Sequence, residues 1–440
     1  MEIPLRYGRD GLTVRLPDAN VRQILRLNPV PALPDAAAAT REALCSPLGA
    51  APLRELAAGR GTVCVVLPDN TRPLPCKALL PPILEELAAA GCAPEDILLL
   101  IATGLHRVAT AEDLEEMLGP EITHAGYRLE SHQARDAASH ALAGHSSRGI
   151  PFLIDRRYLE ADLHILVSLI EPHLFAGYSG GRKMILPGLA SEETICQFHS
   201  PEMIEHPGLA MGLLQGNPAH REAWEAYHAV GGAEFSLACT LNEERQLTGL
   251  WAGATEQTQL AGMRAAERAA KVILDEPADI VVTSNAGYPL DRVFYQGLKA
   301  ITVGAEICRP GGIVIVAQDN EEGLGNAEFA ELILGVDECH TWVSDSLAEG
   351  GPHELDGWAI HQIEQALREH RIFNYSRLPH DLQRRLFVEP VDSVEAGVEL
   401  ALQALGRDAG ITVIPEGPYL LPCLRGDYLA EHSVDDMIAE

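Results

Sequence analysis

The sequence lacks the features that mark membrane and secreted proteins. No apolar run reaches the roughly 20 residues that cross a bilayer. The N-terminus, MEIPLRYGRDGLTVRLP, has no basic region followed by an apolar stretch, so no secretory signal is visible. From these two absences we predict a cytoplasmic protein that has no membrane partner.

Paired cysteines and basic charge are also scarce. The nine cysteines are scattered and no C-x-x-C occurs, which argues against a zinc knuckle or a disulfide framework. Lys and Arg number 33 against 63 Asp and Glu, and the formal net charge is −30. This charge argues against a nucleic-acid partner. A local cluster of cations could still bind a small carboxylate.

The chain instead repeats a strand, a polar loop and a helix. It has 440 residues, of which 47% are hydrophobic, which is ample for two domains with real cores. Buried strands are expected at 61–67, 96–102 and 161–170, and a second α/β region begins near 279. We predict two α/β domains with mostly parallel sheets and an active site in the interdomain cleft. The predicted parts are an N-terminal cofactor-binding domain at 1–272, a C-terminal domain at 273–410 and a tail at 411–440 that packs back on a domain.

Polar side chains follow each of the first three strands. Asp69-Asn70-Thr71-Arg72 follows the first, His106-Arg107 the second, and a loop from His173 to Lys183 the third. That loop contains Gly177, Gly180 and Gly181, which let the backbone approach a ligand closely. In α/β proteins, ligand sites lie at the carboxyl ends of strands. The loop is neither a Walker loop nor a Rossmann fingerprint.

Each of these residues has an ordinary structural interpretation when it is taken alone. His106 could cap the helix after it, and Lys183 could be a salt-bridging surface lysine. Two further groups join the set: His199, and the face of a helix formed by Tyr295, Gln296 and Lys299. The whole set, in order, favours a functional site.

The segments D-N-T-R-P, A-T-G-L-H-R, E-P-H-L-F-A-G-Y-S-G-G-R-K, H-S and Y-Q-G-L-K resemble the nickel-dependent lactate racemase family. The resemblance covers most of the chain, about residues 1–410. It implies a nickel-pincer nucleotide, a pyridinium-3,5-bisthiocarboxylic acid mononucleotide whose two thiocarboxyl groups hold nickel. It implies that Lys183 holds this cofactor covalently and that His199 is the protein ligand of the metal. Asp69, Asn70, Thr71 and Arg72 would contact the cofactor, and separate cofactor-biosynthesis enzymes would be partners.

The resemblance also implies the reaction, which is inversion of C2 of a small anionic 2-hydroxy acid. Hydride leaves C2 for the cofactor and returns to the other face of a planar 2-keto acid. Because the two enantiomers place the hydroxyl on different sides, two bases are needed, and His106 and His173 are suited to the task. The carboxylate and carbonyl oxygen would be held by Arg72, Gln296 and Lys299, with Tyr295 beside them.

Three alternatives stay open at this point. An aldonate 2-epimerase would use the same cofactor on a sugar acid. A metal-dependent hydrolase would use His106, His173 and His199 as three zinc ligands. A non-catalytic protein would bind the nickel cofactor without turnover.

Overall fold

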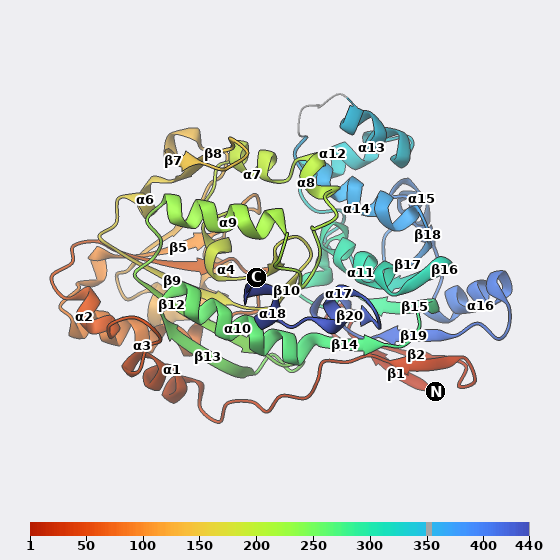
Figure 1. Cartoon of the computed structure of the whole chain (residues 1–440), viewed down its shortest axis with the longest axis horizontal. Coiled ribbons are helices and arrows are strands. Elements are labelled where there is room, and N and C mark those ends of the chain that lie inside the picture. The colour runs from red at the N-terminus through yellow and green to blue at the C-terminus, as the bar shows by residue number, and fades with distance from the viewer. Residues whose placement is uncertain (349–353, 440) are drawn as a thin grey trace. The chain divides into compact units, whose positions relative to one another are not determined.

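A computed structural model describes residues 1–348 and 354–439, and Figure 1 labels its elements. The chain forms two compact units. We call them the β4 unit and the β15 unit after a central strand of each. The β4 unit comprises Pro29–Phe198, Gly208–Ala269 and Val434–Glu440. The β15 unit comprises Met1–Asn28, His199–Pro207 and Ala270–Ser433.

These units differ from the predicted boundaries because the chain crosses between them several times. The first 28 residues join the β15 unit, where β3 (Val21–Ile24) pairs in parallel with β19 (Ile411–Ile414). The predicted tail is therefore divided: β19 belongs to a sheet, β20 (Leu421–Leu424) pairs with β14 (Lys271–Leu274), and the last residues join the β4 unit. A division by sequence position alone cannot capture such crossings.

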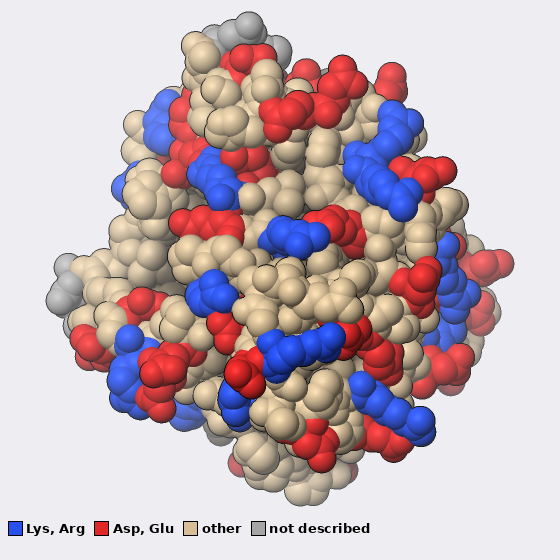
Figure 2. All heavy atoms as spheres, turned by 90° about the vertical axis from the view of Figure 1, so that its right-hand side faces the viewer, with Lys and Arg blue, Asp and Glu red and all other residues tan. Residues whose placement is uncertain are grey.

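The charge excess does not gather into one patch on the face drawn in Figure 2, where acidic and basic side chains are interspersed. Many of the arginines lie in exposed ion pairs, such as Arg371 with Glu389 at 2.6 Å and Arg407 with Glu399 at 2.8 Å. Exposed pairs of this kind add little stability. Among the described residues, no helix is both long enough and apolar enough to span a bilayer.

The sheet of the β4 unit has six strands, and only the pair at one edge is antiparallel. In order they are β13 (Leu247–Gly253), β12 (Phe235–Leu241), β9 (Leu163–Leu169), β4 (Val63–Pro68), β5 (Ile97–Ala102) and β6 (Arg128–Ser131). Every residue of β4 is buried, as expected for a parallel strand that is covered on both faces. The strands predicted at 61–67, 96–102 and 161–170 are confirmed as β4, β5 and β9.

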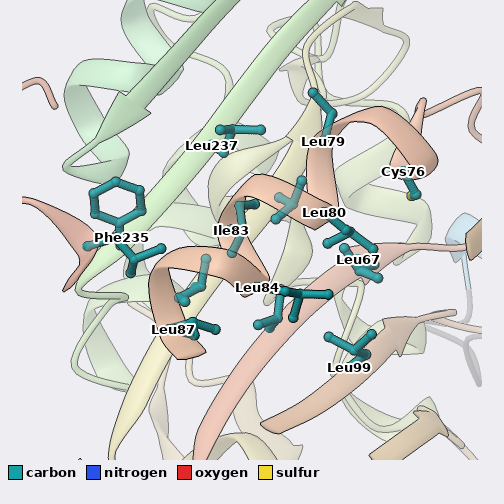
Figure 3. Close-up of a cluster of buried hydrophobic side chains, with 14 of the residues drawn as sticks. Leu67, Cys76, Leu79, Leu80, Ile83, Leu84, Leu87, Leu99, Phe235 and Leu237 are labelled. Atoms are coloured by element: carbon teal, nitrogen blue, oxygen red, sulfur yellow. The ribbon is translucent and has the colours of Figure 1, made fainter. Parts of the chain in front are cut away.

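Helix α3 (Cys76–Ala89) buries one apolar face in the core beside this sheet. Leu79, Leu80, Ile83 and Leu87 recur at helical spacing and are all fully buried (Figure 3). Leu67 of β4 and Leu99 of β5 belong to the same cluster. We expect this packing to fix the loop that leaves β4, because the strand and the helix flank it on either side.

The other elements of the β4 unit surround this sheet or form small hairpins. They are α1 (Ala36–Cys45), α2 (Leu53–Ala57), α4 (Ala111–Leu118), α5 (Pro120–Thr123), β7 (His140–His145), β8 (Pro151–Asp155), α6 (Arg156–Leu159), β10 (Pro172–His173), β11 (Gly177–Tyr178), α7 (Glu192–Phe198), α9 (Pro218–Ala229), α10 (Thr255–Ala270) and α18 (Val434–Ala439). Helix α4 begins with a capping box, in which Thr110 and Asp113 bond each other's backbone.

The sheet of the β15 unit has six strands that are all parallel. In order they are β18 (Glu389–Pro390), β17 (Arg371–Tyr375), β16 (Cys308–Ala317), β15 (Ala278–Ser284), β19 and β3. The remaining elements are β1 (Glu2–Leu5), β2 (Leu12–Arg15), α8 (Pro201–Ile204), α11 (Phe294–Glu306), α12 (Ala327–Gly335), α13 (Cys339–Ala348), α14 (Gly357–Leu367), α15 (His380–Arg385), α16 (Val394–Leu405) and α17 (Tyr428–Glu431). The predicted fold class, two α/β domains with mostly parallel sheets, is confirmed.

Candidate active site

Three polar loops leave neighbouring strands at one edge of the β4-unit sheet. β4 lies between β9 and β5, and its last residue, Pro68, pairs with Ala102 at the end of β5. Asp69 and Thr103 therefore leave the sheet side by side. Two turns follow, in which the backbone N–H of Arg72 bonds the Asp69 carbonyl and that of His106 bonds the Thr103 carbonyl. The predicted segments after β4 and β5 are thus adjacent.

Asp69 and His106 form a hydrogen-bonded pair. His106 Nδ1 lies 2.6 Å from Asp69 Oδ2, and the Thr71 hydroxyl donates to the other carboxylate oxygen at 2.6 Å. Burial alone would raise the pKa of Asp69, but its contacts with His106 and Thr71 and the neighbouring Arg72 outweigh it, so its pKa lies below the ordinary value. An ionised carboxylate can only accept, so His106 carries a proton on Nδ1 and keeps Nε2 as its basic nitrogen.

His173 is held in the opposite tautomer. It lies on β10, which pairs with β11 through His173 and Gly177. Its Nδ1 accepts the backbone N–H of Phe175 at 3.1 Å. A neutral imidazole that accepts at Nδ1 has its proton on Nε2. His106 therefore presents a basic nitrogen at Nε2, whereas His173 presents an N–H that can donate a hydrogen bond.

Gly177 fixes the turn that carries His173. It has φ +72°, and a Cβ atom there would lie 2.4 Å from the Leu213 carbonyl oxygen. We expect Gly177→Ala to lower the free energy of unfolding by about 3 kcal/mol or more, since left-handed strain of roughly 1–2 kcal/mol adds to a clash with backbone. The measurement is urea unfolding followed by circular dichroism.

Gly216→Ala is the matched control for that change. Gly216 has a similar φ of +70°, but a Cβ there would meet nothing within 4 Å. We expect this control to show only the conformational strain, about 1 kcal/mol. Equal losses in the two variants would contradict the assigned close approach to Leu213.

Lys183 lies in a short 3₁₀ turn, Gly181–Met184, whose backbone is fixed on both sides. The Lys183 N–H bonds the Gly180 carbonyl at 3.0 Å, and its own carbonyl accepts from Gly188 at 3.1 Å. Gly188 in turn accepts the N–H of Gly104, at 3.0 Å, from the loop that carries His106. The half-buried Lys183 is thus on a rigid segment that is bonded to the His106 loop.

Two carboxylates that the sequence analysis did not single out, Glu171 and Asp113, contact polar residues of the loops that follow β4 and β5. Arg72 Nε lies 3.5 Å from Glu171 Oε1, directly before Pro172-His173. Asp113 accepts from Asn70 Nδ2 at 2.7 Å and from Arg107 Nη2 at 3.0 Å. The sequence could have pointed to Glu171, because it stands in the E-P-H segment beside His173. Asp113 gave no such sign, because its spacing from Thr110 indicates only a helix cap.

The other predicted residues lie in the β15 unit. Tyr295, Gln296 and Lys299 are on α11, and the ring centroid of Tyr295 is 5.1 Å from that of Trp358. The ring centroid of His199 is 6.4 Å from that of the same tryptophan. Because the Tyr295 hydroxyl donates to Asp356 at 2.8 Å, Tyr295 presents an aromatic wall rather than a proton donor.

A carboxylate clamp holds the short segment that carries His199. Glu205 accepts from His361 Nδ1 at 2.9 Å and from Arg368 Nη2 at 3.1 Å. Gln365 also donates to the Ile204 carbonyl at 3.3 Å. His361 and Gln365 lie on α14, so this helix fixes residues 199–207 within the β15 unit.

The structure thus sorts the predicted residues into two sets. Asp69, Thr71, Arg72 and His106 contact one another, and the loops of His173 and Lys183 belong to the same unit. His199 and the α11 residues form the second set. Across residues 1–348 and 354–439, no three His, Cys, Asp or Glu side chains are grouped so that they could hold a metal ion. The three-histidine zinc alternative therefore gains no support.

Family models for two lactate racemase domains match the chain. The N-terminal domain model matches residues 7–212, and the C-terminal domain model matches residues 273–421. The chain belongs to the lactate racemase family. A lactate racemase from Thermoanaerobacterium thermosaccharolyticum is 31% identical over 421 residues, which covers 95% of this chain and 97% of that protein. A lactate racemase from Lactiplantibacillus plantarum is 31% identical over 379 residues, with 86% and 88% covered.

Solved structures agree with this family assignment. The lactate racemase apoprotein from T. thermosaccharolyticum superposes with a TM-score of 0.87 at 30% identity, covering 96% of this chain and 100% of that one. A protein from Thermotoga maritima superposes with a TM-score of 0.70 at 19% identity and shares the fold. The predicted family resemblance is confirmed, and the chain is an isomerase of the lactate racemase family.

Proposed function

We propose that this lactate racemase family member inverts C2 of lactate or another small 2-hydroxy acid through a 2-keto acid. The proposal assigns the acid–base work to His106 and His173. The observation that carries it is the bond between Asp69 and His106, which holds the His106 proton on Nδ1 and leaves Nε2 as a base for the hydroxyl proton. Inversion needs one neutral imidazole that accepts the hydroxyl proton and one imidazolium that returns a proton, and histidine can take either form near neutral pH.

The residues present are compatible with a nickel-pincer nucleotide. Lys183 offers a half-buried primary amine on a rigid turn, which is the donor that a covalent thioamide requires. His199 offers an imidazole, a ligand that suits Ni(II), and the clamp at Glu205 holds its segment. When it is bound, this cofactor supplies the acceptor for the hydride of C2.

The side chains of the β4 unit would move the proton. As the C2 hydride leaves, the bond between the hydroxyl oxygen and its proton breaks, and the proton passes to His106 Nε2. When hydride returns to the other face of C2, the carbonyl oxygen becomes a hydroxyl again by taking the Nε2 proton of His173 in its imidazolium form, which is left as a neutral imidazole. Forming that imidazolium requires His173 Nδ1 to release the Phe175 N–H and take up a proton. Asp69 stabilises the imidazolium that forms on His106.

Cationic and amide groups would orient the substrate carboxylate. Arg72 is the candidate in the β4 unit, and its partner Glu171 shows that the guanidinium already holds a carboxylate oxygen at 3.5 Å. Gln296 and Lys299 are the candidates on α11. A substrate carboxylate would compete with Glu171 for Arg72, so we assign Arg72 the anionic end of the substrate.

The deciding experiment is intact mass and nickel content of protein made together with the cofactor-synthesis enzymes. We expect a mass gain that maps to Lys183 and about one nickel per chain. The loaded protein is then mixed separately with D-lactate, L-lactate, longer 2-hydroxy acids and aldonates, and loss of optical purity is followed. Adduct without conversion of any substrate would favour a cofactor-binding protein, and conversion of aldonates alone would favour the epimerase.

A further inference from the structure

Arg182 is a fully buried cation inside the loop that connects His173 to Lys183. Its side chain has no exposed surface. Its Nη2 donates to the carbonyl of Ala176 at 2.7 Å and to that of Tyr178 at 3.3 Å. The guanidinium therefore bonds the backbone of the loop from within.

The other two nitrogens of this guanidinium have no hydrogen-bond partner among the described residues. Its Nε and Nη1 are buried, and neither bonds any atom of residues 1–348 or 354–439. Burial lowers the pKa of Arg182 to about 9, which still leaves the group charged at neutral pH. A buried charge that lacks a counter-charge is strongly unfavourable, and natural proteins pair such groups.

A second unpartnered group lies on the helix beside Arg182. Helix α9 packs on the 3₁₀ turn of Arg182, and the guanidinium carbon is 5.8 Å from the ring centroid of Trp224 on that helix. One turn earlier lies His220, whose Nδ1 is buried and bonds no atom of the described chain. Burial and the charge of Arg182 lower the pKa of His220 to about 2, so this imidazole is neutral and can donate one N–H.

Both carboxylates of α9 already have other partners, and Glu225 accepts the backbone N–H of Ser147 at 2.8 Å. Glu222 is buried and accepts from Arg148 through two bonds, Nε to Oε1 at 2.5 Å and Nη2 to Oε2 at 3.0 Å. Within the described ranges, Arg182 forms no ion pair with any Asp or Glu. The positive charge at this place must therefore be balanced by something other than a side chain.

We propose that a buried monovalent anion of halide size, chloride under ordinary conditions, binds to Arg182 Nε and Nη1 and to His220 Nδ1. One negative charge matches the single cation, and a spherical ion needs only donors around it. A polyatomic anion would bring further acceptor oxygens into a place where three donors are unsatisfied. The anion would hold α9 against the loop and so fix the backbone between His173 and Lys183.

The first test is the melting temperature of the full chain in chloride and in gluconate at equal ionic strength. We expect the melting temperature to rise with the logarithm of chloride concentration, bromide to replace chloride, and gluconate to have no such effect. Arg182→Met should abolish the dependence on halide. Arg148→Met removes another arginine that contacts α9 and should keep it. A dependence that persists in Arg182→Met would overturn the proposal.

A second measurement does not require any variant to fold. Crystals of the wild-type chain grown in bromide should show an anomalous peak within contact distance of Arg182 and His220. Density there without an anomalous signal would identify a water molecule and overturn the proposal. A melting temperature that is the same in chloride and in gluconate would overturn it as well.

Discussion

Lys183→Ala should abolish the covalent cofactor and reduce racemisation by at least about 10³-fold, because a freely diffusing cofactor loses the positioning that the tether provides. The backbone around Lys183 is bonded on both sides, to Gly180 and Gly188, so removing the side chain should leave the turn intact. The measurement is intact mass and nickel content of protein made with the cofactor-synthesis enzymes, followed by a racemisation assay. Circular dichroism and the melting temperature show whether the fold is unchanged.

Lys77→Ala is the control, since Lys77 is an exposed lysine on α3 of the same unit. It should retain the adduct, the nickel and the activity. Lys183→Arg keeps the charge but cannot form a thioamide, so it should behave like Lys183→Ala. An adduct of undiminished mass in Lys183→Ala would show that another residue is the tether, and the proposed cofactor chemistry would then need another attachment site.

The sequence predicted the local elements well because its apolar runs are long and clearly bounded. The strands predicted at 61–67, 96–102 and 161–170 lie within about two residues of β4, β5 and β9. Prolines are typical of the first turn of a helix, but α3 begins at Cys76, and Pro81 and Pro82 both lie inside it.

The sequence did not predict which segments belong to which unit. β3 shows no run of buried residues, and its place beside β19 depends on pairing across almost the whole chain. Residues 199–207 belong to the β15 unit because Glu205 bonds His361 and Arg368, which lie 156 and 163 residues away in sequence. Contacts of that kind leave no periodic signal.

For the candidate site, the sequence predicted which residues take part but not how their hydrogen bonds are arranged. The sequence motifs identified His106, His173 and Lys183, because the residue types and their order were sufficient to place them in the site. The tautomers were not predictable, since one depends on Asp69, which lies 37 residues from His106, and the other on a single backbone N–H. The sequence analysis treated the two histidines as equivalent bases, whereas their hydrogen bonds make them different.

That difference predicts a large effect for Asp69→Asn. An asparagine has nearly the same size, but its amide N–H can donate to His106 Nδ1, and the imidazole proton then moves to Nε2. His106 would lose its basic nitrogen, and racemisation should fall by about 10²–10⁴-fold. Because Asp69 has a lowered pKa, it is ionised throughout the neutral range, so its titration should not change wild-type activity there. Asparagine does not titrate, so raising the pH should not rescue the variant.

The decisive measurement on Asp69→Asn is a single turnover with each enantiomer of the substrate. The equilibrium between enantiomers is fixed, so steady-state rates in the two directions must fall together and cannot say which histidine failed. Acid quenching of the loaded enzyme measures the 2-keto acid formed from each enantiomer alone. We expect this amount to collapse for the enantiomer whose hydroxyl faces His106 and to stay within about tenfold of wild type for the other. Equal losses for both would mean that Asp69 acts on a feature common to both half-reactions, and His173→Asn should then fail to show the opposite preference.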